Sequence, residues 1–249
     1  MSTESELSTS FGRAAATYEA GRPEYPAEAV SWLLAPVTGT SSRPRVADVG
    51  AGTGKLTRAL TALGAEVTAV DPDPAMLATL RESLPGVPTF AGTAEALPLP
   101  DGSVDAVVLG QAWHWVDPVA GSAEAGRVVR AGGVLGLVWN LRDDSVPWVG
   151  RLTAVMGGSH AETMLSAGDP VVAEPFGELT GESWSWSRTM TRETLTAMAR
   201  SRSRIITAVV DERARIEREM AELFDEIGAI GDAEVELPYV TRAYRAVRT

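Results

Sequence analysis

The 249-residue sequence contains no cysteine, and this absence excludes disulfide bonds and metal sites built on thiolates. It contains only two histidines, His114 and His160, which are too few for a histidine-rich metal site. We therefore predict no metal site and disfavour metal-dependent chemistry. A site made only of carboxylates stays open.

Long apolar runs are also missing. No run approaches the roughly 18 residues that a membrane-spanning helix requires. The first ten residues are polar and acidic, without the basic flank and apolar stretch of a secretory signal. We therefore expect a cytoplasmic protein that does not interact with membranes.

Positive charge is scarce. Lysine and arginine together number 22 against 33 acidic residues, and the formal net charge is −11 with a sequence pI near 4.7. Such a chain repels the phosphate backbone of nucleic acids, whereas nucleic-acid-binding proteins carry basic patches. A small-molecule substrate fits this balance better, and the sequence does not indicate the oligomeric state.

Apolar runs typical of strands alternate with helical segments along most of the chain. The strands are expected near 45–50, 65–71, 87–92, 104–110 and 133–139, then around 183–188 and within 237–247. The helices are expected near 54–63, 73–83, 119–130, 192–209 and 211–227. This order predicts an α/β protein with a doubly wound, Rossmann-like, seven-stranded and mostly parallel sheet, covered by helices on both faces.

We expect a single domain, 1–249, with four parts. Residues 1–43 read as an N-terminal cap or lid, because a Thr/Gly/Ser/Pro-rich link follows them at 38–44. The core covers 44–140. Residues 141–210 read as a lid of short helices and one strand that sets substrate specificity, and 211–249 as a C-terminal helix and strand.

The most informative segment is an apolar strand that runs into the glycines Gly50, Gly52 and Gly54. A dinucleotide-binding loop needs its third glycine one residue later, where this chain has Lys55. The segment also differs from a phosphate-binding loop, because it lacks the first glycine of that motif and the hydroxyl residue that follows the lysine. The next strand ends on Asp71, 21 residues after Gly50, where a carboxylate can hold both hydroxyls of a ribose. Together these features favour S-adenosylmethionine (SAM) as the cofactor.

Four motifs in order carry a resemblance to a known family. They are residues 46–54, residues 70–77, residues 92–105 and residues 127–133. Over roughly residues 11–140 the chain resembles the class I SAM-dependent methyltransferases, in particular the type-11 group of small-molecule methyltransferases. Residues 15–26 look like the lid of a branch that includes trans-aconitate-methyltransferase-like proteins.

The resemblance implies a set of cofactor-binding residues. Asp48 would accept from the ammonium of the cofactor, Asp71 from its ribose, and Thr93 would replace the acidic or amide residue that relatives place beside the adenine. Tyr18 would close over the sulfonium and Arg22 would pair with the methionine carboxylate. The full set is Tyr18, Arg22, Asp48, Gly50, Gly52, Gly54, Asp71, Pro72, Met76, Thr93, Ala94, Glu95 and Gln111.

Structural readings of the same residues stay open. The glycines can serve only a tight turn, Asp71 can be a helix N-cap, and Met76 can be ordinary helix core. Glu95 can cap a turn in solvent, and the segment with Tyr18 and Arg22 can be a packed helix with a surface arginine.

His114 is the candidate catalytic residue. It follows the fourth expected strand, where ligands bind in doubly wound sheets, and it would deprotonate the methyl acceptor as a general base. A histidine with a purely structural hydrogen bond is the alternative. The expected reaction is in-line transfer of the SAM methyl to an oxygen, nitrogen or carbon of a small molecule. The rivals are a nicotinamide oxidoreductase, a nucleotide-binding regulatory protein without turnover, and a methyltransferase that acts on nucleic acid or protein.

Overall fold

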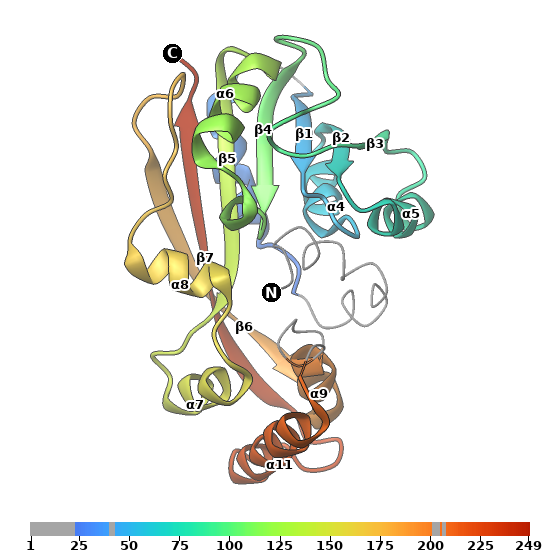
Figure 1. Ribbon diagram of the computed structural model, residues 1–249, viewed down its shortest axis with the longest axis vertical. Coiled ribbons are helices and arrows are strands. Elements are labelled where there is room, and N and C mark those ends of the chain that lie inside the picture. Colours follow the sequence, from blue (N-terminus) through green and yellow to red (C-terminus); the bar gives the residue numbers. More distant parts are fainter. Residues whose placement is uncertain (1–22, 40–42, 201–204, 206–207) are drawn as a thin grey trace.

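A seven-stranded sheet organises the molecule, in the order β3-β2-β1-β4-β5-β7-β6 (Figure 1). The computed structural model describes residues 23–39, 43–200, 205 and 208–249. Strands β1 to β5 pair in parallel, whereas β7 runs antiparallel to both of its neighbours. The strands are β1 (Arg45–Val49), β2 (Glu66–Asp71), β3 (Thr89–Ala91), β4 (Val104–Gly110), β5 (Val129–Arg142), β6 (Thr180–Met190) and β7 (Val235–Val247). The expected mostly parallel α/β sheet is thus confirmed.

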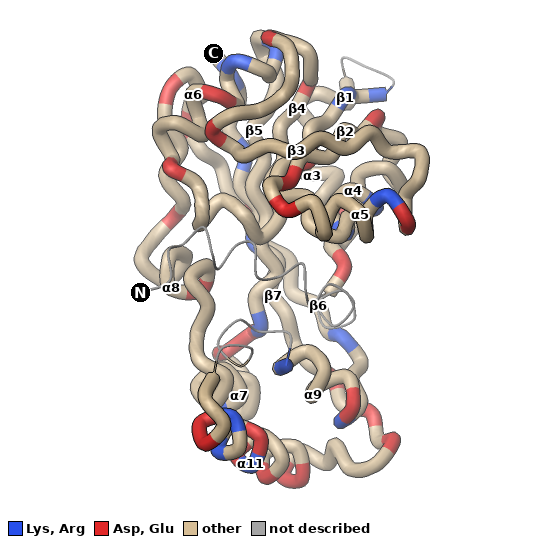
Figure 2. Tube along the Cα trace, turned by 45° about the vertical axis from the view of Figure 1, so that its right-hand side comes forward, with Lys and Arg blue, Asp and Glu red and all other residues tan. Residues whose placement is uncertain are grey.

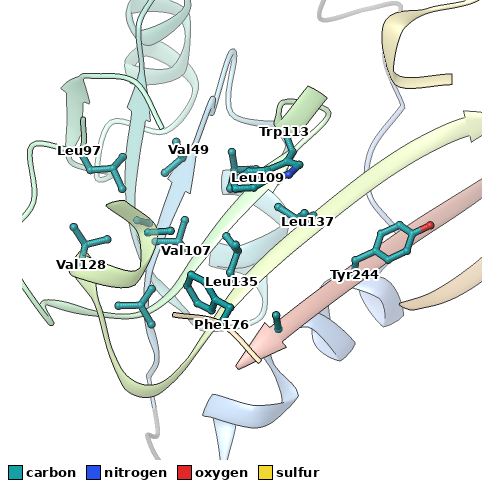
Figure 3. Close-up of a cluster of buried hydrophobic side chains, with 14 of the residues drawn as sticks. Val49, Leu97, Val107, Leu109, Trp113, Val128, Leu135, Leu137, Phe176 and Tyr244 are labelled. Atoms are coloured by element: carbon teal, nitrogen blue, oxygen red, sulfur yellow. The ribbon is translucent and has the colours of Figure 1, made fainter. Parts of the chain in front are cut away.

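Helices cover both faces of this sheet. On one face lie α3 (Ala27–Thr38) and α4 (Lys55–Ala62), with α5 (Pro74–Ser83) against β2 and β3. On the other face, α6 (Pro118–Val128) and α8 (His160–Ala167) close a core that includes Trp113 and Phe176 (Figure 3). Strand β4 is apolar except for Asp105, because both of its faces are buried.

The order in which strands are added to the sheet reverses between β1 and β4. The sequence proceeds outward from β1 through β2 to β3, and then returns to place β4 on the other side of β1. The connecting helices α4 and α6 therefore lie on opposite faces, which opens a crevice at the carboxyl ends of β1 and β4. This crevice is where a ligand is expected in a doubly wound sheet.

A second hydrophobic cluster lies where β6 and β7 extend past the parallel strands. Helices α7 (Pro147–Met156), α9 (Arg192–Arg200) and α11 (Val210–Glu226) pack there around Leu237 and Tyr239 (Figure 1). The buried side chains of α11, which are Ile216, Met220, Leu223 and Phe224, pack in this cluster, while acidic and basic residues lie elsewhere along the helix (Figure 2). Among the described residues, no helix has the length and apolar character needed to cross a membrane.

Two expected assignments differ from the structure. Residues 27–38, which we assigned to the hinged cap, form α3 on the sheet, because Val30, Leu33, Leu34 and Val37 make an apolar stripe that requires burial. The helix expected near 119–130 is confirmed as α6, which ends at Val128, where β5 begins. The helices of the expected 141–210 lid do not lie together: α8 contacts the short helix η2 (Trp113–Trp115), whereas α7 packs on α11.

Candidate cofactor and active site

The glycine loop leaves β1 and is tied to the end of β2. The amides of Gly50 and Ala51 both donate to the carbonyl oxygen of Val70, at 2.8 and 3.1 Å. Gly52 has a φ of 56°, a left-handed conformation that suits glycine, and a side chain added there would meet nothing within 4 Å. At Gly52 the backbone of this loop therefore faces open space that a ligand can approach closely.

A pocket lies in front of this loop, where the strand order reverses between β1 and β4. It combines the loop with the end of β4, with the end of β5 and with a segment that precedes α3. The pocket is lined by Pro23, Tyr25, Asp48, Gly50, Ala51, Gly52, Thr53, Lys55, Leu56, Gly110, Gln111 and Asn140. Four of the residues expected from sequence, Asp48, Gly50, Gly52 and Gln111, thus meet in one place.

Asp48 is fully buried at the base of the pocket. Its Oδ2 accepts a hydrogen bond of 2.5 Å from the hydroxyl of Thr57, whereas its Oδ1 is buried without a partner among the described residues. Burial, and to a smaller extent the charge of Asp71, raises the pKa of Asp48 to about 7, against the opposing effect of the Thr57 hydrogen bond. A buried acceptor that lacks a donor marks a place for a ligand N–H group.

Asp71 ends β2 and supports the glycine loop. Its Oδ2 accepts from the amide of Gly52 and its Oδ1 from the amide of Asp73, both at 2.8 Å. Burial raises its pKa, and these two hydrogen bonds act in the opposite direction. The alternative reading as the N-cap of α5 is wrong, because Asp73 caps that helix by accepting from the amide of Ala75.

Gln111 and Asn140 form the wall of the pocket on the side of β4 and β5. Gln111 has a φ of 56°, an uncommon conformation for a residue with a side chain, and its Nε2 donates to the carbonyl of Asn140 at 2.7 Å. The Asn140 amide donates to the carbonyl of Glu24 and accepts from the hydroxyl of Thr241. The carboxylate of Glu24 in turn pairs with Lys55 at 3.0 Å. These contacts fasten the segment before α3 over the mouth of the pocket.

The remaining expected cofactor residues lie around the same edge of the sheet but do not line this pocket. Gly54 is the N-cap of α4, and Pro72 is exposed after β2. Met76 is buried on α5. Thr93 is exposed after β3, Ala94 packs on the core of the α6 face, and Glu95 accepts from the amide of Asp117 at 3.1 Å. Tyr18 and Arg22 lie outside the described residues.

His114 lies on η2, three residues after Gln111. The indole nitrogen of Trp139 donates to its Nδ1 at 3.3 Å. Because Nδ1 is an acceptor in this contact, the neutral ring carries its proton on Nε2. The two histidine rings lie edge to face with centroids 5.7 Å apart, and the ring of Trp115 lies 4.9 Å from His114 and 5.3 Å from His160. The contact with Trp139 therefore favours hydrogen-bond donation by His114 over a general-base role.

Sequence reasoning missed several residues of the site. Tyr25 packs its hydroxyl against Gly110, and Asn140 links β5 to the N-terminal segment. His160 joins the histidine and tryptophan rings from an irregular region of the sequence. Of these residues, only Tyr25 could have been found from the sequence, because it belongs to the segment that resembles a lid.

Comparisons with known proteins agree with this geometry. Residues 47–137 match the family model described as "Methyltransferase domain". An uncharacterized methyltransferase of Mycobacterium tuberculosis is 42% identical over 247 residues, which cover 97% of this chain and 96% of the relative. An uncharacterized methyltransferase-like protein of Schizosaccharomyces pombe is 34% identical over 250 residues, covering 98% and 97%.

A solved structure from Anaeromyxobacter dehalogenans, provisionally assigned as a type II methyltransferase, superposes with a TM-score of 0.64 at 27% identity and covers 91% of this chain and 97% of that one. The chain belongs to the SAM-dependent methyltransferases. It is an enzyme of that class, and SAM is its cofactor.

Proposed function

We propose that this enzyme transfers the SAM methyl group to a small-molecule acceptor by in-line displacement. The observation that carries the proposal is the pocket between β1 and β4, where Gly52 faces open space and the Oδ1 of Asp48 is buried without a partner among the described residues. The strong excess of acidic residues supports a small molecule over a nucleic acid.

The residues of the pocket suit the methionine end of SAM. The buried Oδ1 of Asp48 would accept from the ammonium group, and the exposed backbone of Gly52 would lie beside the chain of the cofactor. Asp71 would accept from the ribose hydroxyls, since a carboxylate has acceptor sites beyond the two that the loop amides use. Bound SAM supplies an activated methyl group on its sulfonium, so the protein needs mainly to align the acceptor and exclude water.

The acceptor would lie against the rings of His114, Trp115 and His160. In this arrangement the Nε2–H of His114 donates to a polar atom of the acceptor, and Trp115, which is 38% exposed, offers an apolar surface. Such a site suits a flat molecule that carries an oxygen. One partial relative is a demethylmenaquinone methyltransferase of Beutenbergia cavernae, which is 38% identical over 107 residues, or 42% of this chain. The trans-aconitate branch stays a prediction.

The test has two stages. Isothermal titration with S-adenosylhomocysteine (SAH) should give saturable binding to the wild-type protein and much weaker binding to Gly52→Val, whose side chain would occupy the open space. Release of SAH from SAM is then measured with menadiol, trans-aconitate, transfer RNA and a basic peptide. Turnover of menadiol or trans-aconitate supports the proposal. Turnover of only the RNA or peptide contradicts it.

A matched pair of variants tests His114 in any reaction that the panel reveals. Glutamine retains an N–H donor near the position of Nε2, whereas phenylalanine retains only the ring. A donor role predicts that His114→Gln keeps most of the activity and His114→Phe loses it. A general base would instead make both variants equally poor and remove an acidic limb from the pH profile of the wild-type enzyme.

A further inference from the structure

Strand β6 forms one edge of the sheet and is long for an edge strand. It pairs with β7 over all of residues Thr180–Met190, and no other described strand pairs with its outer side (Figure 1). The amide of Ser183 donates to the carboxylate of Glu182 at 3.1 Å, so this amide points away from β7. In an antiparallel ladder the pattern alternates, which places the odd-numbered amides of β6 on the outer edge.

The sequence of β6 is nearly self-complementary about Ser185. Read in opposite directions from that residue, serines match serines, Trp184 matches Trp186 and Glu182 matches Arg188. We propose that a second copy of this chain adds to the sheet here, with the two β6 strands antiparallel and Ser185 of each copy opposite the other.

The backbone supports this register. With Ser185 opposite Ser185, the numbers of two facing residues sum to an even value. Each odd-numbered residue, whose backbone amide points to the outer edge, therefore faces an odd-numbered residue of the second copy. The amides and carbonyls of both outer edges can then pair with each other across the two-fold axis. If one strand were shifted by one residue, the backbone groups on the outer edge of one copy would face residues whose amides and carbonyls point toward their own β7. The hydrogen bonds between the two copies would then be lost.

The side chains support the same register. Glu182 of each copy lies opposite Arg188 of the other, so two reciprocal ion pairs form, and opposite charges across strands are stabilising. Arg188 also interacts within its own chain, and a guanidinium has five N–H donors with which to serve both contacts. The half-buried Trp184 and Trp186 become cross-strand neighbours and lose solvent exposure. In the single chain the carboxylate of Glu182 instead satisfies the Ser183 amide, so pairing exchanges one partner for another.

Because the chain has no cysteine, a single introduced cysteine reports the register directly. The Ser185→Cys variant places two cysteines opposite each other with Cα atoms about 5.5 Å apart, within the range of a disulfide. The Ser183→Cys variant separates the two by about four residues along the strands, roughly 13 Å, which a disulfide cannot span. Under mild oxidation we expect covalent dimers from the first variant and none from the second. Equal cross-linking of both, or of neither, would overturn the proposal.

Sedimentation velocity of the wild-type protein provides an independent measurement, with a concentration-dependent dimer as the expected result. Glu182→Arg should weaken the dimer roughly tenfold, because two attractions become two repulsions, and the double variant Glu182→Arg, Arg188→Glu should restore it. Thermal melting of each variant checks that the fold is intact. A wild-type protein that stays monomeric at the highest soluble concentration, or a double variant that melts normally yet does not recover, would contradict the proposed contact.

Discussion

The protonation of Asp48 should be coupled to cofactor binding. In the free protein burial raises the pKa of this carboxyl to about 7, and its Oδ1 has no partner among the described residues. An ammonium group placed beside Oδ1 favours the carboxylate, and its charge offsets the effect of burial. Binding of SAM or SAH therefore requires that Asp48 lose its proton, and the affinity should depend on pH.

The magnitude follows from the shift of the pKa. The ordinary value is 3.8, and the value in the free protein is about 7. Between these values the folded protein holds a proton that the unfolded chain has released, so the contribution of Asp48 to stability is greatest below pH 3.8 and falls until about pH 7, by about 4 kcal/mol in total. For binding, about 0.9 of a proton is released near pH 6 and about 0.1 near pH 8, and the affinity for SAH rises up to tenfold per pH unit below 7.

Calorimetry measures the released proton. Titrations with SAH at pH 6 in buffers of different ionisation enthalpy give the number of protons, and Asp48→Asn is the matched control because it keeps an acceptor for Thr57 and cannot ionise. The variant should release about 0.9 fewer protons at pH 6, and without ligand it should be more stable than the wild type above pH 7. Burial also raises the pKa of Asp71, whose contribution persists in the variant. Equal proton release by the wild type and by Asp48→Asn would refute the reasoning.

Three further substitutions test other contacts of the structure. Gly54→Ala should lower the free energy of unfolding by about 2 to 4 kcal/mol in urea titrations, because φ is 96° and the new Cβ would lie 2.9 Å from a leucine side chain of α5. Glu162→Gln should cost about 2 to 4 kcal/mol in the same assay, because the Arg142 guanidinium, 4% exposed, loses a charged partner at 2.8 Å; a double substitution by methionine should recover much of the loss. Trp139→Phe removes the donor to Nδ1 of His114, so nitrogen NMR should show one tautomer in the wild type and a mixture in the variant; a mixture in both would remove the basis for the donor role.

The parallel half of the fold could be predicted from the sequence because its signals are local. Strands β1, β2 and β4 are short and mainly apolar, and turn residues separate each of them from the helix that follows. The same reasoning placed Asp48, Gly50, Gly52 and Gln111, since the carboxyl ends of β1 and β4 share one edge of the sheet.

The acceptor side could not be predicted in the same way, because its contacts join distant residues without a local pattern. Asn140 meets Thr241 only because β7 inserts antiparallel beside β5, and the sequence does not specify that neighbour. His160 begins α8 after a glycine pair in an irregular segment, and nothing in that segment points to Trp115. The proton position on His114 depends on Trp139, which reads in the sequence only as part of a buried strand.

The distance of 21 residues between Gly50 and Asp71 has a geometric origin in the sheet. Strands β1 and β2 are parallel with Val49 opposite Val70, so the residue that follows each of them lies at the same level of the carboxyl edge. Gly50 then donates to the carbonyl of Val70, and Gly52 donates to the carboxylate of Asp71. A change in the length of α4 would alter the spacing in sequence and leave this contact intact, whereas a shift of one residue in the β1 and β2 register would turn Asp71 to the opposite face of the sheet. The glycines and the acid therefore form one structural unit, and the strand register, more than their separation in sequence, determines whether they can hold a ribose together.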